Sequence, residues 1–137
     1  MNGKASPLRG FRILVAEDEI IVALGLEATL REAGADVVGP CATLPAALQA
    51  AQDEKLSAAV LDVQLGRDTT EAVALLLSSR KIPYLFYSGQ QLSAEFRARA
   101  PDAPSLIKPV AQKVLVDAVA GLLDTGDEQT AALADPA

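Results

Sequence analysis

Short apolar runs rich in Val and Ile alternate along this chain with longer stretches of helical period. An alternation of this kind predicts a parallel sheet with helices on both faces, which makes the fold class α/β. The expected strands are residues 11–16, 36–42, 58–65, 83–89 and 105–109. A length of 137 residues is close to the commonest size of one domain, so we expect a single folding unit.

The stretches between the expected strands carry helix signals. The first places apolar residues three and four apart and ends at Gly34, which can close a helix. Thr43 can cap the second helix, and Asp68 with Glu71 resembles a capping box for the third. Only residues 92–100 offer a fourth helix, which we therefore expect to be short or irregular.

The last expected helix covers residues 110–123, where apolar residues follow a helical spacing. We therefore assign residues 11–123 to the domain and residues 1–10 to an N-terminal extension. Residues 124–137 are acidic, Ala-rich and aperiodic, and we expect a flexible tail too short to fold alone. Any signal would then pass through contacts made by the domain itself.

Composition excludes several classes of function. The chain has no histidine and one cysteine, Cys41, which excludes a zinc cluster, an internal disulfide and Ser-His or Cys-His catalysis. Cys41 is expected to be a small buried hydrophobe. The net charge is −6 and the basic residues are scattered, so direct nucleic-acid binding is not expected. Without a signal peptide or a long apolar run, we expect a cytoplasmic protein with no membrane insertion.

Polar residues stand at or near the carboxyl ends of four expected strands: Glu17 and Asp18, Asp62, Ser88, and Lys108. In open α/β sheets this edge is where ligands bind. Asp62 is the most informative, because an unpaired carboxylate within an apolar strand would be costly. We expect Lys108 or a cation beside it.

Four motifs stand at these strand ends: ILVAEDE at 13–19, AVLDVQLG at 59–66, FYSG at 86–89 and LIKP at 106–109. Together, and in this order, they resemble the receiver domain of two-component response regulators. The resemblance implies a flavodoxin-like, doubly wound sheet of five parallel strands in the order 2-1-3-4-5. It also implies phosphorelay signalling, here by a stand-alone, single-domain receiver, rather than an enzyme with its own substrate.

The resemblance further implies roles for individual residues. Asp62 would be the phosphoacceptor nucleophile, and Glu17 and Asp18 would hold Mg²⁺ beside it. The backbone carbonyl of Gln64 would be a further metal ligand.

Two more residues and a partner follow from the same resemblance. Ser88 and Lys108 would contact the transferred phosphoryl group through a hydroxyl and a point charge. The phosphoryl donor would be a phosphohistidine on a sensor histidine kinase or a histidine phosphotransfer protein. The downstream protein partner is not indicated by the sequence.

Plainer interpretations stay open. Glu17 could be a helix N-terminal carboxylate, Asp62 with Lys108 a structural salt bridge, and Ser88 a turn residue. Ser105 stands where many receivers carry Tyr or Phe, which favours as an alternative a receiver-like interaction module that works without phosphorylation. An enzyme acting on small phosphates is less favoured, because no Gly-rich phosphate loop is present.

Overall fold

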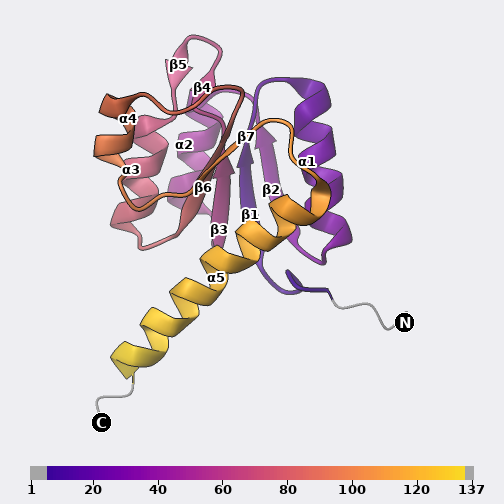
Figure 1. Cartoon of the computed structure of the whole chain (residues 1–137), viewed down its shortest axis with the longest axis vertical. Coiled ribbons are helices and arrows are strands. Elements are labelled where there is room, and N and C mark those ends of the chain that lie inside the picture. Colours follow the sequence, from indigo (N-terminus) through magenta and orange to yellow (C-terminus); the bar gives the residue numbers. More distant parts are fainter. Residues whose placement is uncertain (1–5, 135–137) are drawn as a thin grey trace.

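A computed structural model describes residues 6–134, with side chains described as far as Asp124. Five strands form one parallel sheet in the order β2-β1-β3-β6-β7 (Figure 1). Their bounds are β1 Arg12–Ala16, β2 Asp36–Cys41, β3 Ala58–Leu61, β6 Tyr84–Ser88 and β7 Ser105–Ile107. Counted along the chain, this order is 2-1-3-4-5, which confirms the predicted topology.

Helices cover both faces of the sheet, which confirms the doubly wound arrangement (Figure 1). Helices α1 and α5 pack on one face, and α2, α3 and α4 on the other. Their bounds are α1 Ile20–Glu32, α2 Leu44–Asp53, α3 Glu71–Ser79, α4 Ala94–Arg99 and α5 Gln112–Ala134. The six residues of α4 confirm that the fourth helix is short. Among the described residues, no helix is both long and apolar enough to cross a membrane.

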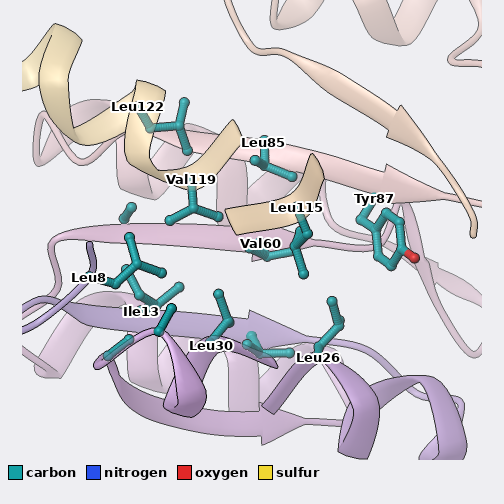
Figure 2. Packing of buried hydrophobic residues seen from close by; sticks show 14 of the residues in the cluster. Leu8, Ile13, Leu26, Leu30, Val60, Leu85, Tyr87, Leu115, Val119 and Leu122 are labelled. Atoms are coloured by element: carbon teal, nitrogen blue, oxygen red, sulfur yellow. The ribbon is translucent and has the colours of Figure 1, made fainter. Parts of the chain in front are cut away.

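One hydrophobic core lies between the sheet and helices α1 and α5 (Figure 2). Leu30 of α1 and Val119 of α5 pack there against strand residues such as Val60. Leu8 is fully buried in the same core, and its N–H donates to the carbonyl of Ala33 at 2.9 Å. The segment before β1 thus contributes to the core, although residues 1–5 lie outside the described residues.

The second core lies under α2, α3 and α4. Cys41 is a buried free thiol in this core, which confirms the sequence-based expectation. Burial raises the pKa of Cys41, so the thiol stays neutral and behaves as an apolar side chain.

The segment expected to complete the third strand, residues 58–65, is divided in the structure. Strand β3 ends at Leu61, and β4 (Gln64–Leu65) pairs antiparallel with β5 (Asp68–Thr69) in a small hairpin. Gly66 supplies a positive φ of 62° in its turn. The predicted capping box is wrong, because Asp68 is engaged in this hairpin and Thr70 is the N-cap of α3.

The last helix also differs from the prediction. It begins at Gln112 rather than residue 110, and it continues to Ala134 rather than ending at Leu123. The added residues include Ala, Glu and Gln, which have high intrinsic helix propensity. Residues 135–137 of the expected tail lie outside the described residues.

Candidate functional site

Four strand ends meet at one edge of the sheet. Ala16 of β1 pairs with Leu61 of β3, so the residues that follow them, Glu17 and Asp62, leave neighbouring strands side by side. Ser88 ends β6, and its carbonyl accepts the N–H of Lys108 at 2.8 Å. The parallel register therefore places the predicted polar residues together, as expected for the carboxyl edge of an α/β sheet.

Three carboxylates form a tight cluster at this edge. Glu17, Asp18 and Asp62 each offer an oxygen atom, and these atoms lie within 4.8 Å of one another. Glu17 is only 1% exposed, whereas Asp18 is exposed. Negative charges this close repel one another, so the cluster requires a cation to be stable in the ionised form.

Lys108 supplies a positive charge to the cluster. Its Nζ lies 2.6 Å from Oε1 of Glu17 and 3.0 Å from Oδ2 of Asp62, and its side chain is 12% exposed. The contact with Asp62 is a hydrogen bond. The contact with Glu17 is a short ion pair to Oε1, which is buried.

Burial and charge shift two pKa values in the cluster. Burial raises the pKa of Glu17, and the charge of Asp62 adds to the effect, against the lowering by Lys108 and by the N–H of Glu19. For Lys108, burial acts to lower the pKa, but contacts with Glu17 and Asp62 outweigh it and the pKa is raised. Lys108 therefore stays protonated and positively charged. The ionised form of Glu17 is destabilised by its burial.

Backbone N–H groups fix the three carboxylates. Val63 donates to Oδ1 of Asp62 at 2.7 Å, and Gly66 in the hairpin donates to Oδ2 of Asp18 at 2.8 Å. Oε2 of Glu17 accepts the N–H of Glu19 at 3.0 Å. The β4–β5 hairpin therefore positions Asp18 from a distance of 48 residues along the chain.

A cleft of about 570 Å³ opens above the cluster, between the hairpin and the loop that leads to α4. Its lining includes the predicted residues Asp18, Asp62, Gln64, Ser88 and Lys108. The hydroxyl of Ser88 accepts the N–H of Gln90 at 3.3 Å. The structure thus brings all the predicted site residues together, with Glu17 buried beneath the cleft.

Known proteins resemble the chain in sequence and in structure. No family model matches it. The transcriptional regulatory protein PdtaR of Mycobacterium tuberculosis is 31% identical over 111 residues, which are 79% of this chain and 54% of PdtaR. The chain thus spans about half the length of this relative.

Solved receiver structures superpose on nearly the whole chain. The signal receiver domain of a modulated diguanylate cyclase from Desulfovibrio desulfuricans has a TM-score of 0.77 and 25% identity, covering 87% of this chain and 98% of that chain. A response regulator receiver protein from Sinorhizobium medicae has a TM-score of 0.76 and 26% identity, covering 85% and 96%. The chain is a response regulator receiver domain.

The receiver domain carries Tyr87 next to its charged cluster. The Tyr87 ring centroid lies 5.8 Å from Nζ of Lys108, and its hydroxyl accepts the N–H of Val110 at 3.3 Å. The ring is buried at the end of the core that α1 and α5 cover (Figure 2). Ser105 lies half-buried in β7, opposite Phe86. The aromatic group beside the lysine therefore comes from β6 in this receiver domain.

Sequence reasoning missed Thr70, a fully buried residue that contacts the backbone at Asp62. The available signal was a Thr directly before the first residue of α3. That signal is typical of a helix cap, and it does not indicate a contact with the residues that follow β3.

Proposed function

We propose that this receiver domain accepts a phosphoryl group on Asp62 and thereby changes its contacts with other proteins. The donor is a phosphohistidine on a sensor histidine kinase or a histidine phosphotransfer protein. The observation that carries the proposal is the setting of the Asp62 carboxylate. Val63 fixes one of its oxygens, Lys108 contacts the other, and Asp62 lines an open cleft.

The acidic cluster fits Mg²⁺. Its donors are carboxylate oxygens, which this ion prefers, and one oxygen from each of the three side chains lies within 4.8 Å of the others. Glu17, Asp18 and Asp62 would hold the ion, with the backbone carbonyl of Gln64 as a further ligand. When bound, Mg²⁺ neutralises negative charge so that a carboxylate and a phosphoryl donor can approach each other.

Phosphoryl transfer needs the reacting groups to be positioned and the negative charge to be stabilised, more than it needs covalent bonds to residues other than Asp62. An oxygen of Asp62 attacks phosphorus, the new O–P bond forms, and the P–N bond to the donor imidazole breaks with its electron pair going to nitrogen. Lys108 then contacts an oxygen of the acyl phosphate, and the Ser88 hydroxyl donates to another. Their movement toward the new charge would carry the signal to the loops that follow β6 and β7.

A second candidate function is protein binding without phosphorylation. Two observations favour it: Ser105 replaces the usual aromatic residue, and α4 has only six residues.

The proposed function is tested by incubating the protein with acetyl phosphate, with and without Mg²⁺, and measuring the intact mass. We expect one added phosphoryl group only when Mg²⁺ is present. An unchanged mass under both conditions would contradict phosphorylation and would favour the second candidate.

Mg²⁺ is expected to raise the thermal unfolding temperature of the wild type at neutral pH, because it relieves repulsion among the three carboxylates. This increase in unfolding temperature should become smaller as the pH is lowered. Because the pKa of Glu17 is raised above 4.5, this side chain takes up a proton at a higher pH than an ordinary glutamate does, and the proton competes with the metal.

The same raised pKa has a consequence without metal. Protonation of Glu17 contributes stability that is present below about pH 4.5 and is lost as the pH rises through the raised pKa.

Asp18→Asn should abolish the increase in unfolding temperature that Mg²⁺ causes, whereas Asp68→Asn, on the exposed β5 strand, should keep it. An equal Mg²⁺ gain in Asp18→Asn, or a gain independent of pH, would argue against the site.

A further inference from the structure

Thr70 is the N-cap of α3, but its side chain does not cap that helix. At the N-caps of α2 and α4, Thr43 and Ser93 accept the N–H of the residue three positions on, at 3.3 and 3.1 Å. Such caps stabilise a helix by about 1 kcal/mol. Thr70 does not form this bond, and its side chain is fully buried, at 0% exposure. Its hydroxyl therefore serves another part of the structure.

The hydroxyl of Thr70 donates to the backbone carbonyl of Asp62 at 2.6 Å, with the carbonyl of Val63 at 3.3 Å as a weaker acceptor. The N–H of Thr70 also donates to the carbonyl of Val63, at 2.9 Å. The residue that begins α3 is thus tied through both its side chain and its backbone to the segment that leaves β3.

The peptide group between Asp62 and Val63 connects Thr70 to the carboxylate. The carbonyl of this peptide accepts from Thr70, and its N–H donates to Oδ1 of Asp62 at 2.7 Å. Hydrogen bonds at the two ends of one peptide polarise it and strengthen each other. Fixing the peptide plane also fixes the direction of the N–H, and therefore the position of Oδ1.

With Oδ1 fixed by Val63, the other oxygen, Oδ2, faces Lys108 at 3.0 Å. A rotation of the Asp62–Val63 peptide would turn the carboxylate relative to Lys108 and to the cleft. Misplacing a reacting atom by about 1 Å can cost up to roughly a hundredfold in rate.

We propose that Thr70 is a positioning residue for Asp62: its hydroxyl holds the Asp62–Val63 peptide so that the carboxylate is presented to the phosphoryl donor. This inference rests on the proposed function. Thr70 does not touch the donor and acts only through the peptide group.

The test compares Thr70→Val, which removes the hydroxyl at nearly constant volume, with Thr70→Ser, which keeps it. Thr43→Val is the matched control, because it removes a threonine hydroxyl from the cap of α2. Phosphorylation by acetyl phosphate with saturating Mg²⁺ is followed by intact mass, and the rate is divided by the folded fraction. The amide resonance of Val63 is recorded by NMR for each protein.

We expect Thr70→Val to react roughly tenfold more slowly than the wild type and to shift the Val63 amide resonance. Thr70→Ser should restore the rate to within about twofold, whereas Thr43→Val should lose thermal stability and keep the wild-type rate. If Thr70→Val does not fold, Thr70→Ala replaces it, because it also removes the hydroxyl that donates to the Asp62 carbonyl.

A wild-type rate in Thr70→Val or Thr70→Ala, with only a loss of stability, would overturn the positioning role and leave the proposed function intact. A Thr70→Ser variant as slow as Thr70→Val would also overturn it, since the hydroxyl would then not matter. A wild-type protein that takes up no phosphoryl group would overturn the proposed function and this role with it.

Discussion

Asp62→Asn is expected to take up no phosphoryl group from acetyl phosphate and Mg²⁺. The side-chain amide is not a nucleophile under these conditions, and the substitution removes the carboxylate oxygen that would form the new bond. The fold should be kept, because asparagine has nearly the same shape and its oxygen can still accept the N–H of Val63. Intact-mass measurement after incubation gives the result directly.

The matched control is Asp68→Asn, which removes an exposed carboxylate from the hairpin at β5. It should be phosphorylated to the wild-type extent, because Asp68 is not part of the acidic cluster. Phosphoryl uptake by Asp62→Asn at the wild-type rate would show that another residue is the acceptor.

The sequence predicted the sheet well because each buried parallel strand is a nearly continuous apolar run. The starts of β2 and β3 were placed at the observed residues, Asp36 and Ala58. The strand order came from the resemblance to receiver domains, since periodicity does not determine which strands are neighbours. Parallel register then explains why residues at four strand ends meet.

The β4–β5 hairpin could not be predicted in the same way. Two strands of two residues each are too short to show a period, and the apolar Leu65 extends the run of β3 in the sequence. The hairpin matters for the site, because Gly66 holds Asp18 and Thr70 follows its second strand.

The pairing of Lys108 was predicted only in part. The sequence indicated Asp62 as its partner, whereas the structure adds the buried Glu17 at 2.6 Å. Periodicity carries no information on which of three nearby acids lies deepest.

Burial of Leu8 was missed for a similar reason, since one apolar residue before a strand has no pattern around it.

Lys108→Ala is expected to lower the free energy of unfolding by about 3 kcal/mol at neutral pH, the cost of leaving one member of a buried ion pair without its partner. Glu17, which is 1% exposed in the wild type, would lie beside Asp62 with no cation in contact. Because small domains are stable by roughly 5–15 kcal/mol, the fold should survive. Denaturant unfolding measures the difference.

The control is Lys113→Ala, which removes an exposed lysine from its pair with Asp117 on α5. That pair is screened by water, so its loss should change stability little. Equal stability of the two variants would show that Lys108 does not compensate the charge of Glu17.

The loss in Lys108→Ala should depend on pH and on metal. Acidification through the raised pKa of Glu17 neutralises the unpaired carboxylate, so the difference from the wild type should shrink at low pH. In the wild type, the stability from Lys108 is present below about pH 10.5 and is lost as the pH rises through its raised pKa.

Mg²⁺ should stabilise Lys108→Ala more than the wild type, because the ion would supply the positive charge that the substitution removes. An equal gain from Mg²⁺ in both proteins would mean that the metal and the lysine act on different carboxylates.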